Sequence, residues 1–140
     1  MQYRVATLDD APLLAEMNQC LILDEGHQNR MSLDELTQRM RGWLEKEYRA
    51  VIFDKGDTCV GYALFKEEPA WVYLRQFFIR KECRRQGLGR AAIVWLSTNV
   101  WSQVGRVRLD VLVNNSTGIA FWKTLDFTEY CLTMERALPK

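Results

Sequence analysis

The sequence of 140 residues is poor in the side chains that build metal centres and disulfide frameworks. Histidine occurs once, as His27, and the four cysteines are dispersed without a CxxC pair. A structural zinc site needs several such ligands at close spacing, so we expect no metal. Four scattered thiols are typical of a reducing compartment. No apolar run approaches the roughly 20 residues that cross a bilayer, so we expect no membrane span.

An excess of charge of one sign is also missing. Lys and Arg number 19 against 18 Asp and Glu, which gives a formal net charge of +1 and argues against a uniformly basic nucleic-acid binder. A basic stripe beside Phe77 and Phe78 is compatible with nucleic-acid stacking, but core packing of these rings is favoured. The first residues lack the basic-then-apolar order of a signal peptide. We therefore expect a cytoplasmic protein that binds neither nucleic acid nor a membrane.

Hydrophobic residues make up 48% of the chain, enough for one core in a single domain spanning residues 1–140. Periodicity and turn residues predict an order of β-α-α-β-β-β-α-β-α-β. The predicted strands cover residues 3–6, 50–53, 59–65, 71–79, 107–113 and 127–136, and the predicted helices cover about residues 11–21, 33–44, 88–101 and 115–125. This order implies an α/β layered domain with a largely antiparallel sheet and one strand–helix–strand crossover.

Local signals set several of these boundaries. Pro12 suits the first turn of a helix, and Ser32 with Glu35 forms a capping box. Residues 54–57 predict a hairpin turn. The helix over residues 88–101 is apolar on most sides, so we expect it to be deeply packed.

The most informative segment is Gln86-Gly87-Leu88-Gly89, between a predicted strand and a predicted helix. Glycines at a helix start let backbone N–H groups approach an anion, and the helix dipole favours negative charge there. Flanking arginines suit phosphate oxygens. The segment lacks the GK[ST] ending of a Walker loop and the third glycine of the dinucleotide fingerprint. A plain tight turn is the alternative, and the arginines favour a pyrophosphate site.

With Arg84-Arg85-Gln86-Gly87-Leu88-Gly89 the chain resembles the GNAT superfamily of acyl-CoA-dependent N-acetyltransferases. The family hallmark is an R/Q-x-x-G-x-G/A turn after a strand and before a long helix. The strand ending Phe77-Phe78-Ile79 and the segment from Asn115 to Phe127 are similar to two further family elements. The resemblance implies a GNAT-like α/β fold whose mixed, mostly antiparallel sheet is flanked by helices on both faces. It also implies acetyl-CoA as cosubstrate, without a metal.

The resemblance assigns roles to individual positions. The backbone of Phe77, Phe78 and Ile79 is expected to bind pantetheine, with the N–H near Ile79 polarising the thioester carbonyl, and Asn115 is expected to contact the CoA arm. The residues expected around the pyrophosphate are Arg84, Arg85, Gln86, Gly87, Leu88, Gly89 and Arg90.

Two positions depart from the family pattern. Trp122 stands where a Tyr usually protonates the departing thiolate, and Asp126 stands where Gly is usual. An indole N–H is not a useful acid, and a packing role for Trp122 is the simpler interpretation. Since a thiol has a pKa of about 8.5, its thiolate is a tolerable leaving group, so we expect an active enzyme with an altered acid. Tyr130 or a water is a candidate substitute.

The general base has three candidates. Asp110 matches a strand position where many family members carry Glu and ranks first, although pairing with Arg106 or Arg108 is an equal alternative. Glu25 and His27, in a polar loop that resembles the variable acceptor-binding segment, come next.

The expected activity is transfer of an acetyl group from acetyl-CoA to a primary amine by direct attack in a ternary complex. The alternative is a CoA-binding regulatory or catalytically inactive interaction module. Acidic Asp24 and Glu25 mildly favour a small cationic acceptor, and the family resemblance makes a homodimer plausible.

Overall fold

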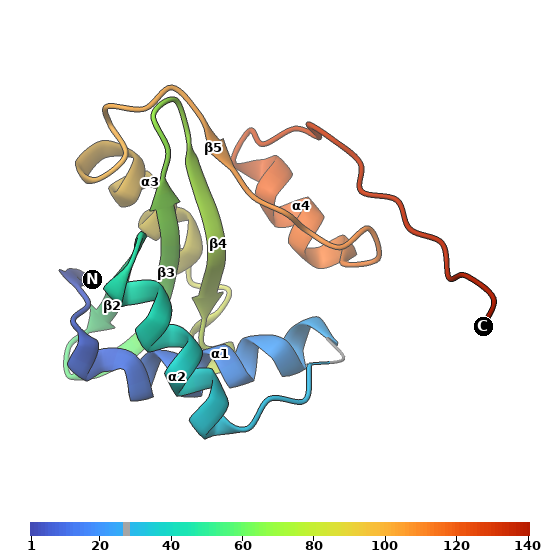
Figure 1. Cartoon of the computed structure of the whole chain (residues 1–140). Coiled ribbons are helices and arrows are strands. Elements are labelled where there is room, and N and C mark those ends of the chain that lie inside the picture. The colour runs from blue at the N-terminus through green and yellow to red at the C-terminus, as the bar shows by residue number, and fades with distance from the viewer. Residues whose placement is uncertain (27–28) are drawn as a thin grey trace. The chain divides into compact units, whose positions relative to one another are not determined.

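A computed structural model describes residues 1–26 and 29–140, which form two compact units, residues 1–110 and residues 111–140 (Figure 1). The first unit contains β1 (Gln2–Val5), η1 (Leu8–Asp10), α1 (Ala11–Glu25), α2 (Leu33–Glu45), β2 (Tyr48–Lys55), β3 (Thr58–Glu67), β4 (Val72–Ile79), η2 (Lys81–Cys83), α3 (Leu88–Asn99) and β5 (Val107–Arg108). The second unit contains α4 (Ser116–Thr124). No helix in these described ranges is both long and apolar enough to cross a bilayer.

The sheet has the strand order β1-β2-β3-β4-β5. The first four strands pair antiparallel, and β5 joins β4 in parallel after the α3 crossover. The predicted mixed, mostly antiparallel sheet with one crossover is therefore confirmed. The predicted hairpin is also confirmed, because Lys55 pairs with Thr58 around a two-residue turn in which Gly56 is left-handed.

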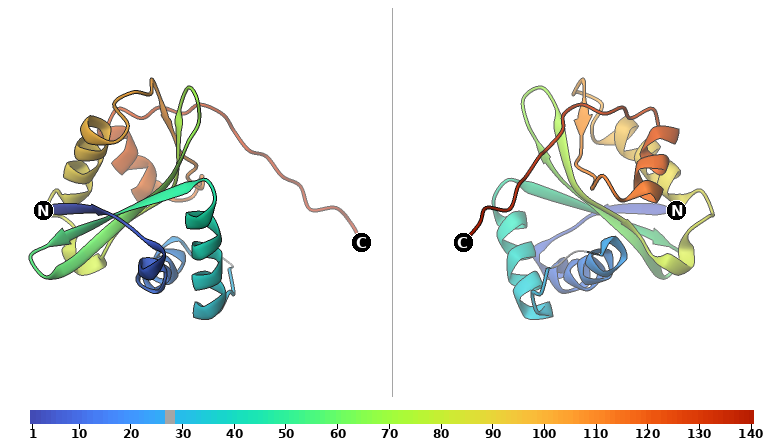
Figure 2. Two further views of the ribbon diagram at one scale, coloured as in Figure 1. Left: turned by 60° about the vertical axis from the view of Figure 1, so that its left-hand side comes forward. Right: turned by 90° about the vertical axis from the view of Figure 1, so that its right-hand side faces the viewer.

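Helices cover both faces of this sheet, as expected (Figure 2). On one face α1 and α2 bury Leu14 and Met40 against sheet residues such as Ile52. On the other face α3 stacks Trp95 on Tyr3, with ring centroids 4.2 Å apart. Burial of these apolar surfaces supplies the main driving force for the layered arrangement.

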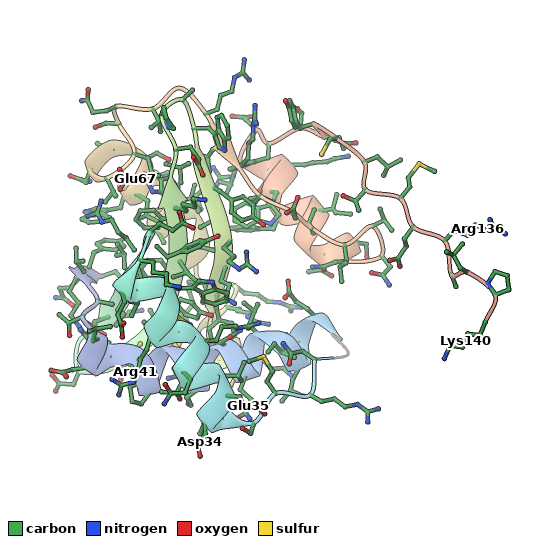
Figure 3. All side chains as sticks on the ribbon, in the orientation of Figure 1. Asp34, Glu35, Arg41, Glu67, Arg136 and Lys140 are labelled. Carbon is green, nitrogen blue, oxygen red and sulfur yellow. The ribbon has the colours of Figure 1, made fainter. Side chains whose placement is uncertain are left out.

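The predicted capping box starts α2. The Ser32 backbone N–H donates to Glu35 Oε1 at 2.9 Å, and the Glu35 N–H donates to Ser32 Oγ at 3.1 Å. Hydrogen bonds to the carboxylate from the backbone N–H and then from the side chain of Ser32 lower the pKa of Glu35. Figure 3 labels Asp34 and Glu35 in this first turn, where carboxylates complement the helix dipole. Pro12 likewise lies in the first turn of α1.

Three expectations about packing and strand length are wrong. Helix α3 buries only one face, formed by Ala92, Ile93 and Leu96, while Val94 is 55% exposed. Strand β5 ends at Arg108 rather than at residue 113, because the β4–β5 ladder stops after two residue pairs.

Residues 127–136 form no strand. Their alternating apolar side chains remain exposed, at 71% for Tyr130, 68% for Leu132 and 82% for Met134. Alternation favours a strand only where a neighbouring strand supplies the ladder hydrogen bonds, and this segment enters no ladder.

Candidate active site

The loop between η2 and α3 presents a row of open backbone amides. Gly87, the N-cap of α3, is left-handed with φ 75°, and Arg85 two residues earlier is left-handed with φ 64°. Within the described part of the chain, the backbone N–H groups of residues 85–89 donate to no protein acceptor. Successive amides of this kind at a helix start form an anion-binding nest. The geometry fits a diphosphate at this position.

Cations from two parts of the chain accompany the nest. Gln86 Oε1 accepts a hydrogen bond of 3.2 Å from Lys55 Nζ, so the β2–β3 hairpin brings an ammonium group to the loop. The side chains of Arg85 and Arg90 are exposed. Together with the roughly +0.5 charge of the α3 N-terminus, these groups favour a ligand with more than one negative charge.

The side chain of Arg84 is committed to protein partners. Its Nε donates to the Ile79 carbonyl oxygen at 2.8 Å, and its guanidinium pairs with Asp24 and lies over the Phe78 ring. Its backbone N–H donates to the Lys81 carbonyl. Arg84 therefore ties the end of α1 to the end of β4 and positions the loop, whereas the open donors belong to residues 85–89.

Within the described residues, no strand pairs with the edge of β4 that faces away from β3 beyond Tyr73, because the parallel ladder to β5 covers only the Val72 and Tyr73 pairs. This stretch without a partner strand is called the open edge. The Arg80 N–H donates to Val60 at 2.7 Å, which sets the alternation along the β3–β4 pair. In an antiparallel pair, every second residue points its N–H and C=O groups away from the partner strand. Here these residues include Phe77 and Ile79, whose backbone polar groups point away from β3. The Ile79 N–H donates to no acceptor within the described residues. An extended ligand arm can pair with such an edge as an added strand would.

A β-bulge in β4 lies beside this edge. Leu64 pairs with Gln76 and Phe65 pairs with Leu74, so Arg75 is the extra residue. Tyr62 donates its hydroxyl to Gln76 Oε1 at 2.7 Å. Burial raises the pKa of Tyr62 well above its ordinary value, so the hydroxyl remains a donor and fixes the Gln76 amide.

Asp110 lies two residues after β5, on the exposed surface of the first unit. Its Oδ2 accepts a hydrogen bond of 2.8 Å from the Tyr73 hydroxyl on β4. Burial and this carboxylate raise the pKa of Tyr73 to about 12. The sequence suggested Arg106 or Arg108 as a partner, and the structure gives Asp110 the Tyr73 phenol, which stays protonated at neutral pH.

The other base candidates lie at the end of α1. Glu25 is the last residue of that helix and is exposed. His27 lies outside the described residues. Asp24, which the sequence associates with a cationic acceptor, is paired with Arg84. No group of three or more His, Cys, Asp or Glu in ranges 1–26 and 29–140 is arranged to hold a metal ion.

The second unit holds the remaining candidates. Asn115 is the N-cap of α4, and its Oδ1 accepts from the Gly118 N–H at 3.0 Å. Trp122 packs edge-on between Phe121 and Phe127, with centroid distances of 4.9 and 5.1 Å, which supports the packing interpretation. Tyr130 is exposed in the segment that follows α4.

The backbone conformation at Asp126 accounts for the glycine that the family usually has at this position. Its φ is 67°, in the left-handed region where glycine is favoured. An L-residue other than Gly, Asn or Asp would be strained there, and Asp is among the tolerated ones.

A family model described as the acetyltransferase (GNAT) family matches residues 14–127. The match covers most of the chain and extends through residues of both units. The chain belongs to the GNAT acetyltransferase family. The resemblance inferred from the Arg84–Gly89 segment is thereby confirmed.

Solved structures show the same GNAT fold. A possible acetyltransferase from Clostridium difficile has a TM-score of 0.81 at 19% identity, covering 99% of this chain and 97% of that one. A predicted acetyltransferase with acetyl-CoA from Clostridium acetobutylicum has a TM-score of 0.77 at 17% identity, covering 97% and 95%. An aminoglycoside acetyltransferase from an uncultured soil metagenomic sample, in complex with sisomicin, has a TM-score of 0.77 at 11% identity, covering 99% and 96%. No curated protein matches the sequence.

Sequence reasoning missed two members of this GNAT site. Lys55 precedes the hairpin turn and lies far along the chain from the glycine motif, yet it contacts Gln86. Tyr73 carries no motif of its own, and only the β4–β5 register places it at Asp110. Neither contact has a local signal in the sequence.

Proposed function

We propose that this GNAT protein is an N-acetyltransferase that transfers the acetyl group of acetyl-CoA to a primary amine by direct attack in a ternary complex. Acyltransfer follows from the family, and the amine acceptor and the mechanism are the proposal. The observation that carries it is the set of open amides at residues 85–89, one loop away from the open edge of β4.

The binding step uses the backbone of the first unit. The amides of residues 85–89 donate to the diphosphate, with Lys55 and Arg85 contributing positive charge. The Phe77 and Ile79 backbone pairs with the pantetheine arm along the β4 edge. Asn115 is proposed to contact the same arm through its side-chain amide, whose Oδ1 is already the cap of α4.

When bound, acetyl-CoA supplies an acetyl group activated as a thioester. The acceptor ammonium loses one proton to a base, and its nitrogen forms a C–N bond to the acetyl carbon while the C–S bond breaks and the sulfur keeps the electron pair. The nitrogen then loses a second proton, and the departing thiolate gains one. The products are the N-acetylated amine and CoA. The Ile79 N–H is proposed to stabilise charge on the thioester oxygen, since it donates to no protein acceptor in the described chain.

Asp110 is the proposed base, and Glu25 is the second candidate. Tyr73 holds the Asp110 carboxylate in one orientation through its hydroxyl, which leaves the other carboxylate oxygen available. A thiolate leaving group, with a conjugate-acid pKa of about 8.5, requires little help from an acid. Tyr130 is proposed as the protein acid if one is needed, because Trp122 cannot take that role.

The test combines binding and turnover. Acetyl-CoA at concentrations well above micromolar should raise the melting temperature, and at least one amine in a broad panel should release free CoA thiol. Stabilisation without thiol release from any amine would favour the CoA-binding module instead. Absence of stabilisation would contradict both functions.

A further inference from the structure

Two arginines stack on one tryptophan on the sheet face covered by α1 and α2. The guanidinium carbons of Arg39, from α2, and Arg75, from the β4 bulge, lie 4.6 and 4.7 Å from the centre of the Trp43 ring. Arg75 also lies over the Tyr48 ring and donates to its hydroxyl at 3.4 Å. The fold therefore collects two positive charges around a single indole.

Within the described residues, neither arginine forms a salt bridge with a carboxylate. Arg39 donates to the amide oxygen of Asn18 at 3.1 Å, and its buried Nε has no hydrogen-bond partner. Burial and repulsion from Arg75 lower the pKa of Arg39. By contrast, Arg80 is paired through both terminal nitrogens with Glu16. Among the residues that the structure describes, the Arg39–Arg75 pair thus has two positive charges without a paired carboxylate, and one buried donor, Arg39 Nε, without a partner.

The pair lies close to the proposed reaction site. Arg75 is on β4, two residues before Phe77, and the adjacent Gln76 is held by Tyr62. The open edge of the same strand is where the acyl donor is proposed to lie. An anion bound by the two guanidinium groups would therefore lie against the same strand that is proposed to bind the acyl donor.

We infer that the acceptor is a small amine that also carries an oxyanion, a carboxylate or a phosphate, bound by Arg39 and Arg75. Guanidinium groups match such oxyanions through paired N–H donors. This inference rests on the proposed function. It differs from the cationic acceptor that the acidic loop residues favour in the sequence, since Asp24 is neutralised by Arg84.

The experiment uses pairs of amines that differ in one anionic group: tyrosine and tyramine, lysine and cadaverine, and phosphoethanolamine and ethanolamine. CoA release gives kcat and KM for each amine, and calorimetric titration of the CoA-saturated protein gives binding without turnover. The first two pairs test a carboxylate, and the third tests a phosphate. Acetyl-CoA binding, measured by thermal stabilisation, tests the proposed function separately.

The expected result is that an anionic member binds and reacts with a KM at least about tenfold below that of its partner. Arg39→Gln and Arg75→Gln should each raise that KM about 10- to 100-fold, the usual effect of losing a hydrogen bond to a charged group. The KM for the partner amine and for acetyl-CoA should be unchanged. Arg41→Gln, on the same helix (Figure 3), is the matched control and should change none of these values.

Preference for the partner amines, equal loss for both members of a pair, or a rise in the KM for acetyl-CoA would overturn the inference. So would acetyl-CoA binding combined with no binding or acetylation of any anionic amine, and in that case cofactor binding itself would stand. Failure to bind acetyl-CoA would overturn the proposed function, and this inference with it. Melting temperatures of the variants separate these results from a loss of packing on Trp43.

Discussion

Tyr73 donates a hydrogen bond to Asp110 across the point where β4 and β5 part. The phenol is on the last residue of β4 that pairs with β5, and the carboxylate is two residues beyond β5. A neutral donor at this position orients the carboxylate and leaves its negative charge in place. The proposed base, Asp110, is thus joined to β4 by one contact inside the first unit.

The pKa of Tyr73, about 12, predicts a late step in the spectroscopic titration of tyrosine. Because the folded-state pKa lies above the unfolded value of about 10, the stabilisation is fully present below pH 10. It is lost as the pH rises through about 12. Tyr62, whose pKa burial raises well above its ordinary value, also titrates late, so the step of Tyr73 is identified by difference. Tyr73→Phe should remove one late step and leave that of Tyr62, and Asp110→Asn should move the Tyr73 step to lower pH. Loss of a step at the ordinary tyrosine pKa in Tyr73→Phe would contradict the hydrogen bond.

Asp110→Asn tests the base. Acetyl-CoA affinity should be nearly unchanged, and the rate should fall most at acidic pH, where the acceptor is an ammonium ion that depends on a base. The loss should shrink at alkaline pH as free amine becomes abundant. The measurement is the pH–rate profile of both proteins. Profiles of identical shape would exclude Asp110 from proton removal, and Glu25→Gln would then be examined in the same way.

Gly89→Glu is expected to abolish acetyl-CoA binding, because it places bulk and a negative charge in the first turn of α3, where the diphosphate is proposed to lie. Gly42→Glu is the matched control. A side chain at Gly42 meets open space, and this position on α2 is remote in sequence from the nest. Thermal stabilisation by acetyl-CoA should disappear only in the first variant. Retained binding in Gly89→Glu would contradict the nest.

Asp126→Gly should stabilise the second unit by up to about 1 kcal/mol, because glycine relieves the left-handed backbone at φ 67°. Hydrogen exchange of the α4 amides measures the change. Asp34→Gly makes the same replacement in the first turn of α2, where φ is helical, and should destabilise by about 0.5–1 kcal/mol. Faster exchange in Asp126→Gly would show that the Asp side chain has a compensating role.

Features that depend on neighbouring residues are predictable from the residue types alone. The capping box of Ser32 and Glu35 and the left-handed turn residues Gly56 and Gly87 each form within a few positions, so their residue types predict their geometry. The loop of residues 84–89, where the diphosphate is proposed to bind, is such a local feature, and for this reason the family was recognisable before the fold. The strand predicted over residues 127–136 is wrong because the prediction used only local pattern. Alternation specifies which side chains would share a face of a strand, but not whether a partner strand exists.

Contacts between side chains that are distant in the sequence follow from the folded arrangement. The hairpin brings Lys55 to Gln86, and the parallel register brings Tyr73 to Asp110. The bulge at Arg75 and the packing of α2 bring a second arginine to Trp43. Strand register, a bulge and helix packing are set by the burial of the whole core, and no single segment encodes them.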